Sequence, residues 1–274
     1  MNSSPRIVIT GDAGNLGNTL CQYLGADWDV IPVGRSDMAR IGQLIPQGCV
    51  VVLHGAFSPS CQPATEPQRF VTDNLMTTAV ALEQARAHKA KLFAFVSSAA
   101  VYGDNPAPKE TDELKPFIVS GAAKALGERM VRDYCTAHDI PFQIYRVFNI
   151  FGGNDTFSVV SKLLNAARGD YPFILNNGGR ALRDFIHVAD LARNIVCLWR
   201  SGFINGAINL ASGKGVAIED LVSVVRKHYP QLKIEHRSAP EVAVCVADMT
   251  LSSQFLYSDL MPVTSWLGRS AGGK

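Results

Sequence analysis

The sequence is poor in the features that mark membrane, secreted and nucleic-acid-binding proteins. No apolar run approaches the roughly 20 residues that a membrane-spanning helix needs, so we expect no membrane partner. The first residues also lack the charged and long apolar segments of a secretory signal, which favours a cytoplasmic location. Lys and Arg number 26 against 24 Asp and Glu, without a basic block, so nucleic acid is not an expected partner.

The cysteines give no sign of a disulfide frame or a metal site. There are six of them, no two stand as a C-x-x-C pair, and several lie inside apolar segments. Disulfide-rich domains and zinc sites use paired or closely spaced cysteines. We therefore expect buried free thiols in a reducing compartment, and no metal.

What the sequence does contain is a regular alternation of short apolar runs and longer helical segments. With 274 residues, 47% of them hydrophobic, the chain can bury a sizeable core. Apolar strands that alternate with helices are typical of a parallel sheet covered on both faces, and they predict a doubly wound α/β fold of the Rossmann type. The expected strands are 6–10, 30–33, 50–54, 92–97, 142–148 and 207–210, and the expected helices include 73–88, 120–138, 187–200 and 216–230.

This alternation thins in the second half of the chain, which indicates a second, smaller unit. We expect residues 1–150, together with about 185–205, to form the Rossmann-type domain. The other segments, about 151–184 and 206–274, are expected to form a small α+β lobe. The terminal SAGGK is expected to be disordered.

The first strand runs directly into a glycine-rich segment, TGDAGNLG. In dinucleotide-binding folds the first glycine permits a tight turn, the second lets the backbone approach a pyrophosphate, and the third lets the helix pack against the strand. The alternative is a plain glycine-rich turn, but a position between a strand and a helix is the context that the motif requires. The residues expected to contact the cofactor, here and after the third strand, are Thr10, Gly11, Gly14, Asn15, Leu16, Gly17, Gly55 and Ala56.

The end of the second strand, VIPVGRSD, bears on the choice of dinucleotide. Sites for NAD place an acidic residue there to accept a hydrogen bond from the ribose 2′-OH, whereas sites for NADP offer room and positive charge. Gly34 occupies the expected acidic position, and Arg35 and Ser36 follow it. These residues predict NADP, with NAD as the alternative, and place Asp37 near the adenine. The competing interpretation is that Arg35 is a solvated surface residue.

Further motifs follow in order along the chain and, with the glycine segment, identify a resemblance. They are VSSAAVYG at 96–103, SGAAKALGE at 120–128, RVFNIFG at 146–152 and RDFIHVADLA at 183–192. Over roughly residues 6–250 the chain resembles the extended short-chain dehydrogenase/reductases that act on nucleotide sugars, namely epimerases, 4,6-dehydratases and 4-keto reductases. The terminal helix and the Gly-Trp-x-Pro-like ending of that family are missing or degraded, which predicts a reduced substrate lobe.

The resemblance implies roles for five residues. Ser98 would hydrogen-bond the substrate oxygen that undergoes redox change, and Lys124 would bind the nicotinamide ribose and lower a neighbouring pKa. Asn74 would lie near the site, while Asn149 and Arg183 would contact the substrate, with the Arg183 guanidinium on its diphosphate. Three of these residues also have a structural alternative, because Ser98 and Asn74 could cap secondary structure and Arg183 could form a surface ion pair.

The sequence departs from the family at the catalytic tyrosine. Family members carry Tyr-x-x-x-Lys, with both side chains on one helical face, and the tyrosine is the general acid/base. Here Ser120 stands at the tyrosine position, four residues before Lys124. A serine hydroxyl is a far weaker acid than a phenol, whose pKa lies near ~10, and it is shorter.

Three interpretations of this departure stay open. The chain could be a nucleotide-sugar enzyme whose proton donor is Ser98, a water on Ser120 or another group; an enzyme of altered chemistry; or a non-catalytic NADP-binding module. The intact remainder of the site favours an enzyme with a nucleotide-sugar substrate. The resemblance also implies a homodimer through a four-helix interface built from segments 73–88 and 120–138, whose apolar residues exceed the needs of one core-facing stripe.

Overall fold

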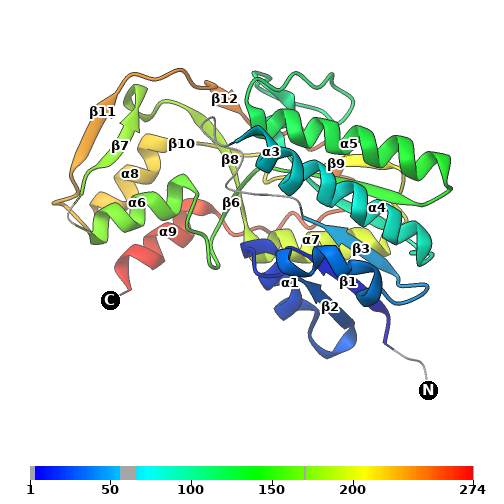
Figure 1. Cartoon of the computed structure of the whole chain (residues 1–274). Coiled ribbons are helices and arrows are strands. Elements are labelled where there is room, and N and C mark those ends of the chain that lie inside the picture. Colours follow the sequence, from blue (N-terminus) through cyan, green and yellow to red (C-terminus); the bar gives the residue numbers. More distant parts are fainter. Residues whose placement is uncertain (1–3, 56–65, 170, 274) are drawn as a thin grey trace.

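The computed structural model describes residues 4–55, 66–169 and 171–273, which form a large α/β unit and a smaller lobe (Figure 1). The large unit is built on a six-stranded sheet with the order β2-β1-β3-β4-β5-β9. All neighbouring strands in it are parallel. These strands are β1 (Arg6–Thr10), β2 (Asp29–Val33), β3 (Val51–His54), β4 (Phe93–Ser98), β5 (Phe142–Val147) and β9 (Gly206–Leu210). The predicted doubly wound α/β fold is confirmed.

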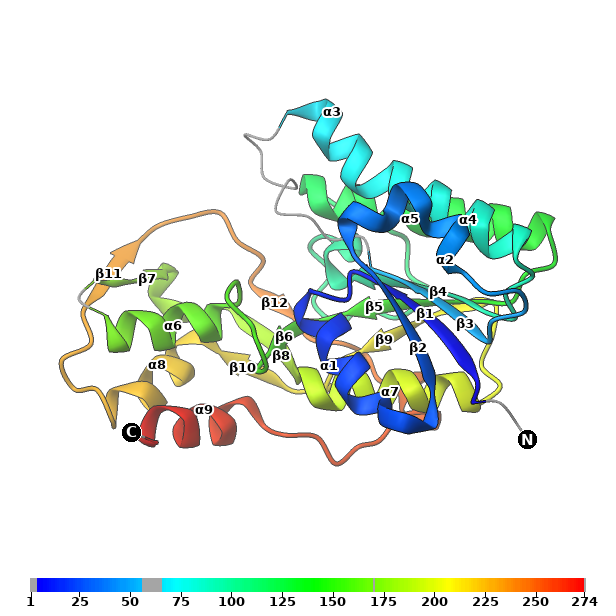
Figure 2. The same ribbon diagram turned by 60° about the horizontal axis from the view of Figure 1, so that its bottom comes forward.

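Helices cover both faces of the sheet (Figure 2). One face carries α1 (Asn15–Leu24) and α7 (Val188–Arg200), and the other carries α2 (Ile41–Leu44), α4 (Thr77–Ala87) and α5 (Val119–Ala137). Parallel strands buried on both faces are apolar at nearly every position, because each face needs a hydrophobic lining. This explains why the strands stand out in the sequence as continuous apolar runs.

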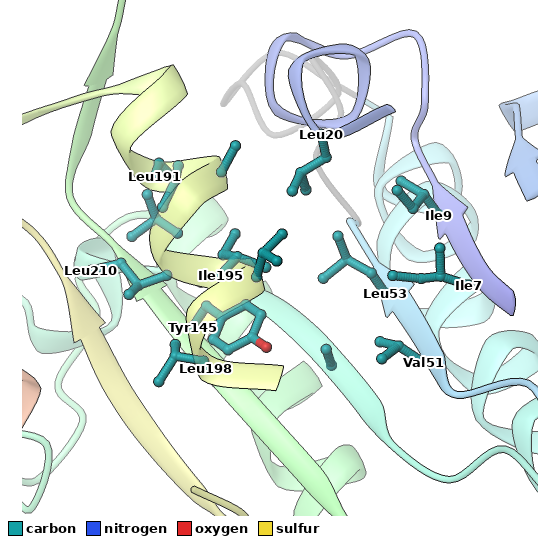
Figure 3. Packing of buried hydrophobic residues seen from close by; sticks show 14 of the residues in the cluster. Ile7, Ile9, Leu20, Val51, Leu53, Tyr145, Leu191, Ile195, Leu198 and Leu210 are labelled. Carbon is teal, nitrogen blue, oxygen red and sulfur yellow. The ribbon is translucent and has the colours of Figure 1, made fainter. Parts of the chain in front are cut away.

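Alternate residues of each central strand serve two separate hydrophobic cores. In β1, Ile7 and Ile9 pack with Leu20 and Ile195 under α1 and α7 (Figure 3), whereas Val8 belongs to the core on the opposite face. All five side chains are inaccessible to solvent. Full burial of an aliphatic side chain of this size stabilises a fold by about 1.5–3 kcal/mol. The two cores therefore hold β1 and its C-terminal glycine segment rigidly in place.

The smaller lobe combines short strands with three helices. A mixed sheet has the order β10-β8-β12, with β6 also on β8, and β11 pairs with β7. The strands are β6 (Asn149–Phe151), β7 (Phe173–Asn176), β8 (Leu182–His187), β10 (Gly215–Ala217), β11 (Ile234–Arg237) and β12 (Val244–Cys245), and the helices are α6 (Val159–Arg168), α8 (Ile218–Arg226) and α9 (Val263–Gly272). Helix α9 (red in Figure 1) packs on α8.

Two sequence predictions about this half of the chain were wrong. A terminal helix is present, because Val263, Leu267 and Ala271 recur at a spacing of four and bury one helical face, and the helix continues to Gly272 within the expected disordered tail. Residues 206–210 form β9 beside β5 in the large sheet, although they were assigned to the lobe. Their apolar run completes the edge of that sheet.

The described residues contain neither a membrane-spanning helix nor a metal-binding cluster of side chains. None of the helices in these ranges has both the length and the apolar character needed to cross a bilayer. Nor do three or more His, Cys, Asp or Glu side chains come together there in a group that could hold a metal ion.

Candidate active site

The glycine segment forms a tight loop between β1 and α1 that leaves its backbone accessible. Gly11 has a φ of +73°, a conformation that favours glycine, and its N–H donates to the carbonyl oxygen of Val33 at 3.0 Å. A Cβ atom on Gly17 would collide with the carbonyl oxygen of Gly11. Helix α1 begins after Gly14, which has no side chain to cap it. The first-turn N–H groups therefore present a positive helix end that fits a pyrophosphate.

Asn15 connects this loop to the segment that follows β6. Its side-chain Nδ2 donates to the carbonyl oxygen of Gly152 at 3.0 Å, and its Oδ1 accepts from the N–H of Asn154 at 2.8 Å. The next residue, Leu16, packs its side chain against the core under α7, which leaves its backbone for any ligand contact. The side chain of Asn15 thus joins the large unit to the lobe beside the glycine loop.

A buried chain of hydrogen bonds runs behind the loop. Thr10 Oγ1 lies 2.8 Å from His54 Nδ1 and accepts from the N–H of Gly55 at 3.1 Å. His54 Nε2 lies 3.1 Å from the hydroxyl of Thr78, which donates to the carbonyl oxygen of Asn74 at 2.7 Å. These contacts fix the ends of β1 and β3 against the helix that carries Asn74.

His54 was not singled out by the sequence, although a histidine that ends an apolar strand is a recognisable signal. Burial, assisted by the positive charge of Lys124, lowers the pKa of His54 to about 3. The ring is therefore neutral at physiological pH and acts as a structural link. Ala56, predicted to contact the cofactor, lies outside the described residues.

Asn74 lies in the π-helical turn Val71–Met76, which precedes α4. Its side chain is 4% exposed, and its Nδ2 donates to the carbonyl oxygen of Phe70 at 2.9 Å. Single π-helical turns within α-helices are frequent at functional sites. The side chain thus has a structural contact in this turn, in addition to the role that the resemblance implies.

Helix α5 brings Lys124 and Ser120 to one helical face, one turn apart. Lys124 is 8% exposed, and its Nζ donates to the carbonyl oxygen of Val96 in β4 at 2.6 Å. The same Nζ lies 5.0 Å from the centre of the Phe95 ring. Ser120 is half-buried at the start of the helix. The lysine is therefore held against the end of β4 by the packing of α5.

Ser98 is the last residue of β4 and caps the short 3₁₀ turn Ala99–Tyr102. Its Oγ accepts a hydrogen bond from the N–H of Ala100 at 3.2 Å. The capping alternative is thus realised in the structure. It leaves the hydroxyl hydrogen of Ser98 available, because the capping bond uses the oxygen as acceptor.

A buried ion pair fixes α5 next to these strands. The side chains of Glu128 and Arg146 are 1% and 3% exposed, and Arg146 Nη2 lies 2.8 Å from Glu128 Oε2. Ser97 donates to Glu128 at 2.6 Å, and Arg146 Nη1 donates to the hydroxyl of Tyr102 at 2.9 Å. Burial raises the pKa of Tyr102 despite the neighbouring guanidinium. The Tyr102 hydroxyl therefore stays protonated and donates a hydrogen bond to Asn209 Oδ1, which is a structural contact.

The lobe supplies Asn149 and Arg183, the two predicted substrate residues. Asn149 Nδ2 donates to the carbonyl oxygen of Asp184 at 2.8 Å, so the two segments are adjacent. Arg183 Nη2 lies 3.6 Å from Glu241 Oε2, and its side chain is 18% exposed. The ion-pair alternative for Arg183 is therefore present, with Glu241 as the partner.

Asp184, which sequence reasoning missed, anchors the strand that carries Arg183. Its carboxylate is fully buried and accepts from the N–H and hydroxyl of Ser212 and from the N–H groups of Gly213 and Ala247. Burial raises its pKa, and these hydrogen bonds oppose the rise. The residue therefore fixes β8 against the segments after β9 and β12.

The end of β2 carries the residues predicted to select the cofactor. Arg35 and Ser36 are exposed, as expected for residues that could meet a 2′-phosphate. The carboxylate of Asp37, however, pairs with Arg40 at 2.7 Å. An ideal Cβ on Gly34 would lie 3.5 Å from Asp37 Oδ2. The Asp37 carboxylate therefore lies next to the place where an acidic side chain at residue 34 would begin.

Comparisons with known proteins agree with this arrangement. The model of the NAD dependent epimerase/dehydratase family matches residues 7–211. A UDP-glucose 4-epimerase of Corynebacterium glutamicum is 25% identical, over 98% of this chain and 97% of the relative. Among solved structures, a UDP-N-acetylglucosamine 4-epimerase from Methanobrevibacter ruminantium M1, in complex with UDP-N-acetylmuramic acid, has a TM-score of 0.86 at 21% identity, with 98% and 97% of the two chains covered. A UDP-glucuronic acid 4-epimerase from Bacillus cereus, in complex with UDP-glucuronic acid and NAD, has a TM-score of 0.84 at 23% identity, with 96% of each chain covered.

Proposed function

The chain belongs to the NAD dependent epimerase/dehydratase family, and from this premise we propose that it is an enzyme acting on a nucleotide sugar. The observation that carries the proposal is the hydrogen-bonded bridge from Asn15 to Gly152. It sets the glycine loop beside the segment that begins with Asn149, and Asn149 in turn contacts the strand of Arg183. A cofactor phosphate on the loop and a substrate on the lobe would therefore be neighbours.

The residues of the loop fit a nicotinamide dinucleotide. The uncapped N-terminus of α1 and the close approach of Gly17 to Gly11 provide the backbone surface that a pyrophosphate requires. A bound nicotinamide ring would supply a hydride acceptor and donor for a sugar carbon. Within this class of cofactor, the exposed Arg35 favours NADP, as the sequence predicts, whereas the family description and the carboxylate of Asp37 favour NAD.

Lys124, Ser98 and Ser120 are the residues that we assign to the reaction. The Lys124 ammonium, held on Val96, would hold the ribose of the cofactor and supply positive charge to the site. Ser98 would donate a hydrogen bond from its hydroxyl to the reacting sugar oxygen. We infer that Ser120 stands where relatives of this type carry a tyrosine, so a water held by Ser120 or the Ser98 hydroxyl would move the proton, at a reduced rate.

Arg183 would bind the diphosphate of the substrate. A guanidinium matches phosphate oxygens with a fork of N–H donors, and this one is partly exposed. A diphosphate would have to displace the Glu241 carboxylate from Arg183 or bind the guanidinium beside it. The ion pair would therefore lower the affinity for the substrate. Since the relatives named above are UDP-sugar 4-epimerases, 4-epimerisation of a UDP sugar is the first activity to test.

One observation favours a second candidate, a non-catalytic dinucleotide-binding module. If Ser120 stands at the position of the general acid, its hydroxyl is a much weaker acid than a phenol, and removal of a general acid typically costs about 10²–10⁴ in rate. Against this stands the presence of Ser98, Asn149 and Arg183, which are assigned to the substrate and which a module that only binds the cofactor would not need. Turnover of any nucleotide sugar decides between the two.

We also propose a homodimer and a cytoplasmic location. Met76 and Leu126, on the two helical segments expected to form the interface, are 53% and 48% exposed. Large apolar side chains on paired helices favour an isologous contact between two copies of the chain. The five described cysteines are free thiols, which fits a reducing compartment.

Thermal shift against UDP, GDP, dTDP and CDP sugars tests the substrate class. At least one nucleotide sugar should raise the melting temperature, and Arg183→Ala should remove that shift while the affinity for the dinucleotide is retained. Arg180→Ala, at an exposed arginine three residues earlier, is the matched control and should behave like the wild type. If no nucleotide sugar stabilises the wild type, while small ketones or acyl compounds do, the substrate assignment is wrong.

A further inference from the structure

The lobe contains a cavity that takes no part in the proposed reaction. It lies between α6, α9 and the segment that follows β6, and its volume is about 360 Å³. None of the described residues that we assign to the reaction lines it. Small-molecule sites have volumes of roughly 300–1,000 Å³, so this cavity fits a single small ring but not a whole nucleotide sugar.

Contacts at both ends hold the walls of the cavity in place. At one end, Arg168 Nη2 donates to the carbonyl oxygen of Ser270 at 2.8 Å, which joins the last turns of α6 and α9. At the other end, the side chain of Asn15 binds the carbonyl oxygen of Gly152 and the N–H of Asn154. The cavity is therefore preformed, as most small-molecule sites are.

Part of the lining is apolar and includes an indole ring. Val160 and Leu164 are 1% and 6% exposed, so their side chains are fixed in the lobe core. The half-buried Trp266 ring packs edge-to-face on Phe151, with the ring centres 5.5 Å apart and the planes at 68°. Its remaining surface lines the cavity. A fixed aromatic ring is a flat apolar surface, and the C–H face of a saturated ring can pack on it.

The rest of the lining is polar and has hydrogen-bonding capacity left. The side chain of Asn165 is exposed and makes no hydrogen bond to another described residue, so its two donors and its acceptor are available. Arg168 uses Nη2 on Ser270, which leaves Nε and Nη1 as donors. Asp155 is the other charged residue among the described lining, and its charge balances that of Arg168. The lining therefore favours a neutral ligand over an anion.

A small, neutral ring with one apolar face and a rim of hydroxyl groups is a pyranose. We propose that this cavity is a second sugar-binding site, which takes one neutral pyranose ring with its C–H face on Trp266 and its hydroxyls on Asn165 and Arg168. The inference goes beyond the proposed function, since the site shares no residue with the proposed reaction. A phosphorylated sugar would bring negative charge to a guanidinium whose charge a carboxylate of the same cavity already balances.

Saturation-transfer difference NMR with the full chain tests the proposal by binding rather than by activity. The probes are the methyl glycosides of glucose, galactose and N-acetylglucosamine. At least one should bind with a Kd of about 1 mM, which is ordinary for a ligand of this size. Asn165→Leu removes the free amide and should weaken this binding at least about fivefold. Lys162→Leu, at an exposed position of α6 outside the cavity, is the matched control and should bind like the wild type.

Arg168→Gln provides a second variant, from which the same weakening is expected. Absence of a signal from all three glycosides, or equal binding by the wild type and Asn165→Leu, would overturn the proposal. Displacement of the glycosides by inorganic phosphate would also overturn it, because the site would then prefer an anion. Signals that disappear when UDP is added would place the sugar in the active site instead.

The two assignments fail separately. Loss of this second site would leave the proposed function unchanged, because the thermal shift with nucleotide sugars depends on Arg183, which does not line the cavity. Conversely, glycoside binding that depends on Asn165 would stand even if no nucleotide sugar were bound or converted.

Discussion

Replacement of Glu128 by glutamine should destabilise the protein strongly, because it leaves the Arg146 guanidinium buried without its counter-charge. The two side chains are 1% and 3% exposed, and the pair is bidentate, with Arg146 Nη2 at 2.8 Å from Oε2 and Nε at 3.0 Å from Oε1. Burial acts to lower the pKa of Arg146, but the hydrogen bonds and charge of Glu128 raise it overall. Removal of one partner of such a pair costs about 3–5 kcal/mol.

The assay is urea unfolding followed by circular dichroism, with a matched pair of variants on the same helix. Glu128→Gln should lower the free energy of unfolding by about 3–5 kcal/mol. Asp133→Asn breaks the exposed pair with Arg129 on α5, whose side chains are 61% and 74% exposed, and should have no measurable effect. Equal effects of the two variants would refute the reasoning, because the cost would then not come from burial.

A double-mutant cycle isolates the pair from its surroundings. Arg146→Met should also destabilise, because Glu128 is then left buried and unpaired, and the double variant should be less destabilised than the sum of the two single variants. Additive effects would contradict a direct coupling. Since Glu128 lies one helical turn after Lys124, a loosened α5 should also weaken cofactor binding.

The remaining predictions concern pH, catalysis and assembly. His54 has a pKa of about 3 in the fold against an ordinary 6.5, so its stabilising contribution is complete above pH 6.5 and falls towards pH 3, by about 1.4 kcal/mol per pH unit. His54→Gln should remove this pH dependence of the free energy of unfolding, whereas His236→Gln, at an exposed histidine, should keep it. A pH dependence that is unchanged in His54→Gln would contradict the assignment. Ser120→Tyr should raise turnover up to about 10²-fold, because Lys124 lies one helical turn away and would lower the pKa of the new phenol. Ser120→Phe, which adds the ring without the hydroxyl, should not raise it. If both variants lower the rate equally, the site has a different chemistry. Light scattering at micromolar concentration should give a dimer for the wild type and a monomer for Leu126→Glu, and a monomeric wild type would exclude the proposed interface.

The strands and the main helices could be predicted because burial on both faces leaves a strong local signal. The run at β1 was predicted with its observed bounds, and α5 and α7 within one residue at each end. The edge strand β9 has the same apolar sequence signal, but its local sequence does not determine which of the two sheets it joins. Helix α9 was not predicted because its ten residues include Gly268 and Gly272, whose low helix propensity weakens the signal from the four-residue spacing of its buried side chains.

The polar contacts of the site could not be predicted, because they join residues far apart in the chain. Asp184 meets Ala247 at a separation of 63 residues, and Thr10 meets His54 at 44. The sequence identifies each residue type but not its partner, so a buried acceptor such as Asp184 cannot be recognised until the neighbouring segments are placed. Residues assigned through the family resemblance depend on motif position alone, and their roles stay predictions until they are measured.

The most direct test of the proposed function is product analysis by proton NMR after incubation of the purified chain with NAD and a UDP sugar. UDP-glucose, UDP-N-acetylglucosamine and UDP-glucuronic acid should be offered separately, to the wild type and to Lys124→Ala. We predict that at least one sugar is slowly converted to its 4-epimer by the wild type and that Lys124→Ala abolishes the conversion. Absence of any altered sugar with the wild type, or conversion that persists undiminished in Lys124→Ala, would contradict the assignment of this site.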